Sequence, residues 1–159
     1  MDKALADKLA AAALSRVPAG AHVLEVEAGL GALTLRAARA GARVDAVDAS
    51  KAMVAALKAR VAVAKLANVE ARVGDPAALP FVERTFDGAY CIGVVAAGRV
   101  EMLAELRRVL KPGASAVVAA AGGAAARDEL VDEMMVAGFD EVQSHAVEKT
   151  DAWLITGIA

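Results

Sequence analysis

Three acidic side chains, each expected where a predicted strand ends, are the first residues whose spacing indicates chemistry. Glu25 and Asp48 lie at the ends of two β-prone segments, and Asp75 ends a third. The sequence separation of Gly31 and Asp48 is close to the spacing of about 20 residues that nucleotide-binding folds have between this glycine turn and a carboxylate. In those folds the carboxylate accepts hydrogen bonds from the ribose hydroxyls. Because the carboxyl ends of parallel strands meet at one edge of a sheet, these acids are expected to line a ligand site there.

A glycine turn separates the first predicted strand from a helix. In the segment VLEVEAGLGALT, residues 23–34, Gly29 and Gly31 have no Cβ atoms, so the backbone can approach a ligand. The helix that follows presents unpaired backbone N–H groups at its first turn. Such a turn alone also fits a strand-to-helix connection that binds nothing, and the position of Asp48 favours the ligand-binding interpretation.

The elements that must position these residues alternate between short β-prone segments and longer helical ones, a pattern typical of an α/β domain with a parallel sheet. Strands are expected at 21–26, 42–48, 69–75, within 86–95 and at 115–120, followed by a final pair, expected to be antiparallel, at 140–147 and 151–158. Helices are expected within 1–16, 31–40, 50–66, 101–110 and 127–139, with Ser50 as an N-cap. The segment AAGGAAAR, residues 120–127, is expected to be a loop that helps to cover the site.

The length and composition indicate one soluble domain. The 159 residues are enough for a single core, with an N-terminal helix in residues 1–18 and a core domain in residues 20–158. The hydrophobic fraction of 58% owes much to alanine, and no uncharged apolar run reaches the roughly 18 residues that a membrane span needs. We therefore expect an alanine-rich cytoplasmic protein that does not enter a membrane.

The net charge and the small number of Cys and His residues argue against a nucleic-acid partner and a metal site. The net charge is −2 and the basic residues are scattered among acidic ones, so no nucleic-acid partner is expected. A single cysteine, Cys91, excludes an internal disulfide and a thiolate metal cluster within one chain. His22 and His145 are far apart in sequence and add no metal-ligand spacing. No metal site is predicted.

Six ordered segments resemble one known family. VLEVEAGLGALT, VDAVDAS, VGDPAALPF, TFDGAYC, LRRVLKPGAS and AGFDEV are similar to motifs of the class I S-adenosylmethionine-dependent methyltransferases, in particular the small-molecule group called type 11. The resemblance covers about residues 20–158. It implies a Rossmann-like, mostly parallel, seven-stranded sheet in the order 3-2-1-4-5-7-6 with helices on both faces. It also implies S-adenosylmethionine as cofactor and a small-molecule methyl acceptor.

The resemblance assigns one group of residues to the methionine side of the cofactor. Glu25 would face the methionine ammonium, directly or through water. Ala28, Gly29 and Gly31 belong to the turn that would pass beneath the methionine and ribose, and Cys91 would bring the backbone of the fourth strand near the methionine.

A second group would hold the adenosine. Asp48 would accept hydrogen bonds from the ribose hydroxyls, and Ala49 would lie against the adenine. Asp75 would accept a hydrogen bond from the adenine amino group, with Pro76 alongside.

Two positions depart from the family pattern. The family usually has glycine where this chain has Glu27, whose side chain could point away from the ligand, approach the positive ammonium or sulfonium group, or impair binding. Ala96 and Ala97 stand where the family often has histidine or aromatic residues that face the substrate. The sequence therefore names no catalytic residue, and methyl transfer would depend on alignment of the reactants.

Several alternatives remain open at this stage. A nicotinamide-binding fold would require a third glycine where Thr34 stands. A non-catalytic module that binds the cofactor or a protein, or a simplified scaffold of the same fold, fits Glu27 and the two alanines. Trp153 is expected to anchor the terminal strands, and an exposed tryptophan there would indicate a homodimer.

Overall fold

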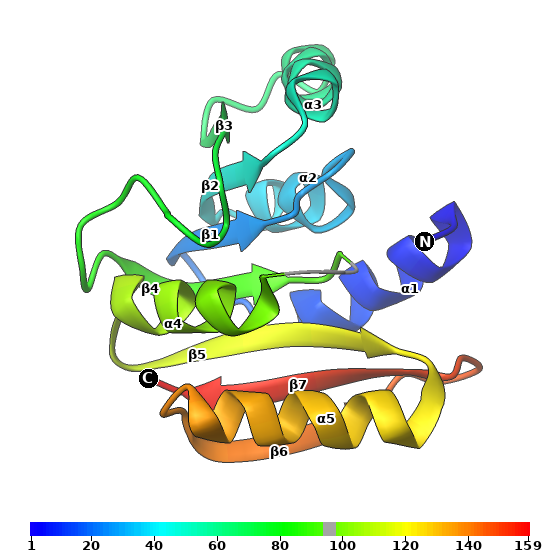
Figure 1. Ribbon diagram of the computed structural model, residues 1–159. Helices are drawn as coiled ribbons and strands as arrows, with labels where there is room; N and C mark the ends of the chain where they lie inside the picture. Colours follow the sequence, from blue (N-terminus) through cyan, green and yellow to red (C-terminus); the bar gives the residue numbers. More distant parts are fainter. Residues whose placement is uncertain (94–97) are drawn as a thin grey trace.

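The strands form one seven-stranded sheet, as expected. The computed structural model describes residues 1–93 and 98–159, and the sheet order is β3-β2-β1-β4-β5-β7-β6 (Figure 1). β1 to β5 pair in parallel, and β7 is antiparallel to both β5 and β6, which confirms the predicted fold class and the antiparallel final pair. The strands are β1 His22–Val26, β2 Arg43–Asp48, β3 Val69–Val73, β4 Phe86–Cys91, β5 Leu110–Ala121, β6 Asp140–Ala146 and β7 Ala152–Ile158.

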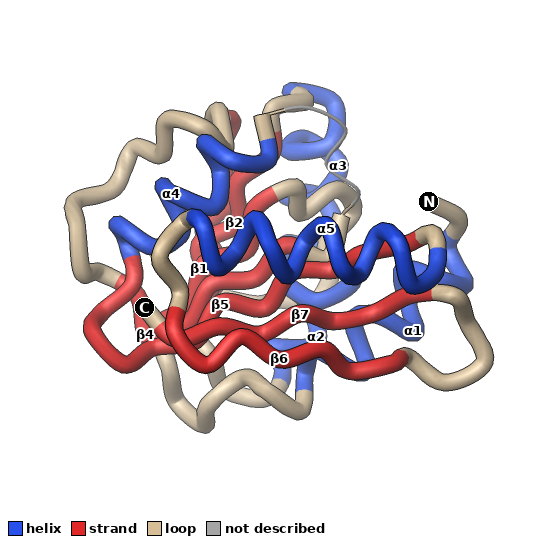
Figure 2. Tube along the Cα trace, turned by 60° about the horizontal axis from the view of Figure 1, so that its bottom comes forward, coloured by secondary structure: helices blue, strands red, loops and turns tan. Residues whose placement is uncertain are grey.

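Helices cover both faces of this sheet. One layer contains α1 (Lys3–Leu14), α2 (Ala32–Arg39) and α3 (Lys51–Val63), and the opposite layer contains α4 (Arg99–Val109) and α5 (Gly123–Val136). Figure 2 shows α5 running along the last strands of the sheet. The alternation of side chains along each strand therefore supplies a separate apolar core to each layer.

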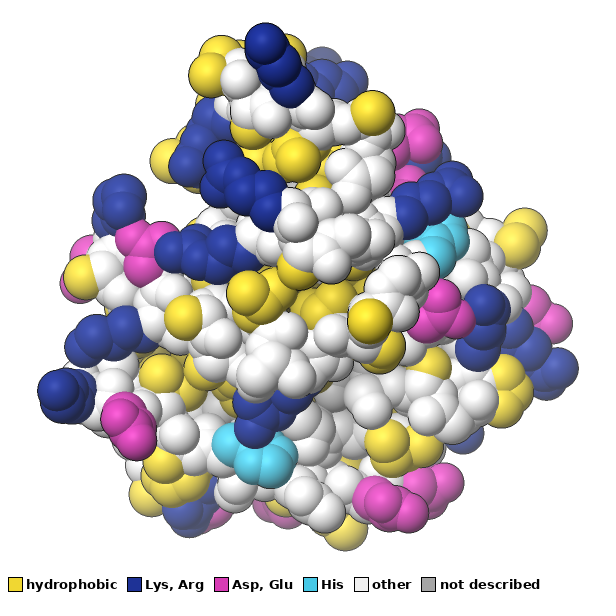
Figure 3. All heavy atoms as spheres, turned by 180° about the vertical axis from the view of Figure 1, so that it is seen from behind, with side chains coloured by type: hydrophobic (Ala, Val, Ile, Leu, Met, Phe, Trp, Pro, Cys, Tyr) yellow, Lys and Arg dark blue, Asp and Glu magenta, His cyan; other side chains and the backbone are white. Residues whose placement is uncertain are grey.

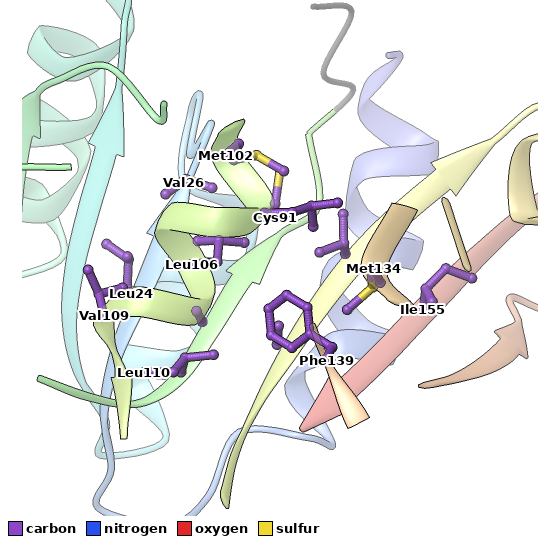
Figure 4. Packing of buried hydrophobic residues seen from close by; sticks show 14 of the residues in the cluster. Leu24, Val26, Cys91, Met102, Leu106, Val109, Leu110, Met134, Phe139 and Ile155 are labelled. Atoms are coloured by element: carbon purple, nitrogen blue, oxygen red, sulfur yellow. The ribbon is translucent and has the colours of Figure 1, made fainter. Parts of the chain in front are cut away.

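The core beneath α4 and α5 is built around β1, β4 and β5. Leu24 and Val26 of β1 are fully buried and pack with Leu106 of α4 (Figure 4). Met134 of α5 and Phe139, which follows that helix, complete the cluster at the other end. On the opposite face, α1 and α2 bury small and aliphatic side chains, many of them alanine, so the low aromatic content does not prevent close packing.

Side-chain caps fix the starts of two helices. The Asp2 carboxylate accepts a hydrogen bond from the backbone N–H of Leu5 at 2.8 Å, and the Ser50 hydroxyl accepts one from Met53 at 3.3 Å. Ser50 is thus the N-cap of α3, as predicted.

Several boundaries differ from the prediction by a few residues; β3, for example, ends at Val73 and so before Asp75. Two of the differences change how a segment is described. The segment AAGGAAAR is not a loop, because residues 120–121 end β5 and α5 begins at Gly123. Alanine has the highest helix propensity, so once Gly122 has turned the chain with φ 117° the next residues continue as helix. β5 also begins earlier than expected, at Leu110, and includes the Lys-Pro-Gly segment.

The helices are of moderate length, and charged side chains of both signs occur on the surface (Figure 3). Among the described residues, no helix has the length and apolar character to cross a bilayer. On the face seen in Figure 3, basic side chains are spread around the surface, with acidic side chains between several of them.

Candidate functional site

The candidate site lies at the carboxyl edge of the sheet, where the parallel strands end. β1, β2, β4 and β5 all point to the right in Figure 1, so the segments that follow them meet on that side. The turn after β1 is at the centre of this edge, because β1 lies between β2 and β4. The neighbouring loops come from β2, β3 and β4.

The two glycines of the turn after β1 have different roles: Gly31 allows close packing, and Gly29 leaves open space. Glu27, Gly29 and Gly31 all have positive φ angles, of 53°, 53° and 76°. A Cβ on Gly31 would lie 2.4 Å from a methyl carbon of Leu57, so this glycine lets α3 pack against the turn. A Cβ on Gly29 would meet no atom within 4 Å. The space beside Gly29 is open, as a ligand passing over the turn requires.

Asp48 braces the turn from the neighbouring strand. It is 7% exposed, and its two carboxylate oxygens accept hydrogen bonds from the backbone N–H groups of Gly29 and Ser50, both at 2.8 Å. Each oxygen keeps a second lone pair that could accept from another donor. Asp48 therefore holds the loops after β1 and β2 together, a role that the sequence did not predict, and the ribose role remains a prediction.

Glu25 carries a buried oxygen with no partner. The side chain is 1% exposed, and the Thr34 hydroxyl of α2 donates a hydrogen bond to Oε2, while Oε1 has no partner among the described residues. Burial raises the pKa of Glu25 to about 7, opposed by the Thr34 hydrogen bond and increased further by the charge of Asp48. Thr34, at the position where a nicotinamide fold would have glycine, thus orients this carboxylate.

Glu27 lies among the acids of the edge. Its pKa is raised by partial burial and then by the negative charges of Asp48 and Asp75. No side-chain hydrogen bond to Glu27 is present in the described part of the chain. The Glu27 carboxylate therefore lies in the negative field of Asp48 and Asp75.

The residues expected to hold the adenosine lie beside the carboxyl edge of the sheet. Asp75 is exposed, two residues beyond β3, and its carboxylate accepts a hydrogen bond from Ala77 N–H at 2.8 Å. Ala49 is exposed and Pro76 is half-buried, so both can contact a ligand. The backbone N–H of Gly74 donates to Asp48 O at 3.1 Å, which ties the loop after β3 to β2.

Cys91 contributes to the core through its side chain. The residue is fully buried, and its sulfur lies near Met102 of α4 (Figure 4). Burial, followed by the charges of Glu27 and Glu25, raises the pKa of the thiol far above its usual range. This thiol is not a nucleophile at neutral pH. Its proposed backbone role near the methionine remains a prediction, and Ala96 and Ala97 lie outside the described residues.

The edge acids, defined as Glu25, Glu27, Asp48 and Asp75, have no compensating cation. Within residues 1–93 and 98–159, no Lys, Arg or His side chain forms a salt bridge with any of them. Like charges held together in a partly buried site repel one another. These hydrogen-bond acceptors therefore suit a ligand that has hydroxyl or amino groups and a positive charge.

A separate groove lies on the α1 side of the sheet. It has a volume of about 230 Å³ and is lined partly by Arg16, Gln143, His145 and Thr156, none of which belongs to the carboxyl edge. His145 Nε2 is 3.2 Å from the Thr156 hydroxyl, and burial lowers its pKa. His145 is thus a sheet-face residue and cannot act at the glycine turn.

Sequence comparison identifies the family. Residues 23–113, more than half of the chain, match the family model described as a methyltransferase domain. The chain belongs to this methyltransferase family. Membership confirms the resemblance that the six segments indicated. Two curated relatives from Tropheryma whipplei, strains Twist and TW08/27, both named demethylmenaquinone methyltransferase, are 38% identical over 114 residues, or 69% of this chain. The chain spans 45% of the length of these relatives.

Solved structures of this methyltransferase fold superpose on nearly the whole chain. The (4+2)-cyclase SpnF has a TM-score of 0.85 and 17% identity, over 96% of this chain and 80% of SpnF. The glycopeptide N-methyltransferase MtfA, complexed with sinefungin, has a TM-score of 0.81 and 20% identity, over 96% of this chain and 93% of MtfA. At these identities the similarity shows a shared fold.

Proposed function

We propose that this methyltransferase-family chain binds S-adenosylmethionine at its carboxyl edge and transfers the methyl group to a small molecule. The observation that carries the proposal is the buried Glu25 oxygen without a partner, at a glycine turn surrounded by uncompensated acids. A buried polar atom without a partner is costly in a folded protein, and a ligand ammonium would satisfy it. The 38% identity to demethylmenaquinone methyltransferases supports the reaction class and a small-molecule acceptor.

The residues of the edge fit this cofactor. Each Asp48 oxygen keeps one lone pair that could accept from a ribose hydroxyl. Asp75 is exposed and could accept from the adenine amino group. Gly29 leaves open space over the turn. Glu25, with a pKa near neutrality, would become fully ionised when a ligand ammonium joins it, because an adjacent positive charge lowers a carboxyl pKa.

Catalysis in this proposal depends on alignment. When bound, S-adenosylmethionine supplies a methyl group on a positively charged sulfur, which is a reactive electrophile. The buried Cys91 and the remote His145 do not serve as bases at the edge. The chain's contribution is to hold the reacting atoms about 3 Å apart in line, which supplies a large share of the rate enhancement in such reactions.

Titration calorimetry tests the proposal. We expect one S-adenosylmethionine site per chain. Asp48→Ala should weaken binding about tenfold to a hundredfold, because it removes charge-assisted hydrogen bonds worth roughly 1.5 to 3 kcal/mol. Asp75→Ala should also weaken binding without affecting the brace between β1 and β2. Asp140→Ala, which removes an exposed acid at the start of β6, is the control and should bind like the wild type.

The outcomes separate the competing functions. Binding together with methyl transfer to an acceptor panel supports the enzyme. Binding without any turnover supports the non-catalytic module. Unchanged affinity in folded Asp48→Ala and Asp75→Ala proteins would refute the assignment of the adenosine site, and absence of binding by the wild type would refute the proposed cofactor.

A further inference from the structure

Glu27 occupies a backbone conformation that favours glycine. Its φ of 53° is in the left-handed region, which residues with a side chain rarely adopt. The segment after β4 makes room for it, since a Cβ on Gly93 would lie 2.9 Å from both the Cβ and the main-chain oxygen of Glu27. Strained residues cluster at functional sites, where the surrounding structure maintains them. Lys65, Arg84, Glu141 and Lys149 have similar φ angles, and Glu27 differs from them in lying at the glycine turn, against Gly93.

The charged groups around Glu27 indicate what kind of ligand its side chain could contact. The negative charges of Asp48 and Asp75 act on Glu27, and those of Glu27 and Glu25 act on Cys91. Glu27 therefore adds a further negative charge to a region that already holds three acids and no paired cation in the described residues. Such an arrangement is unfavourable for the free protein. Protonation of a carboxyl relieves part of this repulsion, and a ligand that brings positive charge relieves it with the carboxylates ionised.

Glu25 and Glu27 have distinct positions relative to such a ligand. Glu25 is held in the core by Thr34 and presents one buried oxygen, which suits the fixed ammonium of the methionine. Glu27 is two residues further along, in the turn itself, between the loops of Asp48 and Gly93. A ligand whose ribose is at Asp48 and whose ammonium is at Glu25 must pass its sulfur across this turn.

We propose that Glu27 makes the site selective for ligands with a positive charge at the sulfur position, so that S-adenosylmethionine binds in preference to its demethylated product, S-adenosylhomocysteine. This inference depends on the proposed function. Methyl transfer leaves the carbon–sulfur electron pair on the sulfur, which becomes a neutral thioether, while the acceptor gains the methyl group and releases a proton to solvent. Glu27 then loses its electrostatic partner, and release of the product is favoured.

Three ligands that differ at one position test the selectivity. S-adenosylmethionine carries a sulfonium there, sinefungin carries a protonated amine, and S-adenosylhomocysteine has an uncharged thioether. All three share the same ammonium and adenosine. Calorimetry on Glu27→Gln should show about fivefold to thirtyfold weaker binding of the two charged ligands and little change for S-adenosylhomocysteine, as expected for loss of one partly screened charge pair.

A matched variant and a folding control complete the test. Glu83→Gln removes one charge from the exposed loop before β4, at the opposite edge of the sheet, and should leave all three affinities unchanged. Glu27→Gly relieves the left-handed strain and should lose the same selectivity as Glu27→Gln, so a folding defect cannot produce the result. Thermal unfolding of each variant without ligand verifies the fold.

Each outcome has a defined meaning. An equal loss for all three ligands would place Glu27 at the shared ammonium and overturn the inference, while leaving the proposed function intact. A gain for all three would identify Glu27 as an obstacle and overturn it as well. If the wild type binds none of the ligands, the proposed function fails together with the inference.

Discussion

Two sets of acids in this chain differ in their partners. The paired acids, defined as Asp45, Asp87 and Glu105, lie away from the glycine turn, and each contacts a cation. Asp45 contacts His22 at 2.6 Å and Arg72 at 3.0 Å, Asp87 contacts Lys111 at 2.7 Å, and Glu105 contacts Arg108 at 2.6 Å. The edge acids have no such partner among the described residues.

This difference separates structural acids from acids that are kept for a ligand. The pKa values of Asp87 and Glu105 are lowered by their hydrogen bonds to Lys111 and Arg108, which is the direction expected for stabilising carboxylates. The pKa values of Glu25 and Glu27 are raised, chiefly by burial, so their charged forms oppose folding. Among the described residues, the acids with a raised pKa, Glu25 and Glu27, both lie at the glycine turn, where a cationic ligand would compensate their charge.

The largest expected effect concerns the paired acids. Asp45→Ala removes a 3% exposed carboxylate from between His22 and Arg72. It should lower the free energy of unfolding by about 3 kcal/mol, because two hydrogen bonds to a charged acceptor are lost, although Arg72 keeps its contact with Glu70. Urea unfolding measures the loss. Lys111→Ala, which breaks a more exposed pair with Asp87, should cost less than about 1 kcal/mol. Equal costs would remove the distinction between buried and exposed pairs.

The next effect concerns the edge acid Glu25. Its ionised carboxylate should lower the stability of the folded protein, whereas the carboxylates of the paired acids raise it. The folded-state pKa of Glu25 is about 7 against an ordinary 4.5, so between these values the folded state holds a proton that the unfolded state has lost. Stability should therefore fall as pH rises through this window and level off above it. The decrease attributable to Glu25 is on the order of 3 kcal/mol. Below the window both states are protonated and Glu25 adds no pH dependence to the stability.

Glu25→Gln isolates this contribution. The variant has no titrating group at this position, so urea unfolding at about pH 5 and about pH 8 should show a smaller decrease than in the wild type. At the higher pH the variant should be the more stable protein. If the wild type instead gains stability relative to the variant as pH rises, Glu25 is a stabilising carboxylate and the contrast between the two groups is wrong.

Much of the fold could be predicted because it depends on local patterns. Alternating β-prone and helical segments indicated the strands, and the resemblance to the methyltransferase family implied the sheet order that the structure has. The Ser50 cap was predictable for the same reason. The first turn of α5 was not, since a run of glycine and alanine is equally compatible with a loop until the end of β5 and Gly122 fix its direction.

The details of the site depend on contacts between distant segments. Asp48 was expected at the edge, but its brace to Gly29 and the hydrogen bond from Thr34 to Glu25 require the packed positions of β1, β2 and α2. The orientation of Glu27 likewise depends on Gly93, which is remote in sequence. These interactions carry no sequence signature beyond the residue types themselves.

The most direct test of the account is a crystal structure grown with excess S-adenosylmethionine. The account predicts the nucleoside across the carboxyl edge, with its ribose hydroxyls on Asp48, its adenine beside Asp75 and its ammonium at Glu25. The sulfonium should lie next to the Glu27 carboxylate. A ligand bound elsewhere, or a carboxyl edge filled by the Glu27 side chain, would contradict the central claim that these acids are kept for a cationic nucleoside.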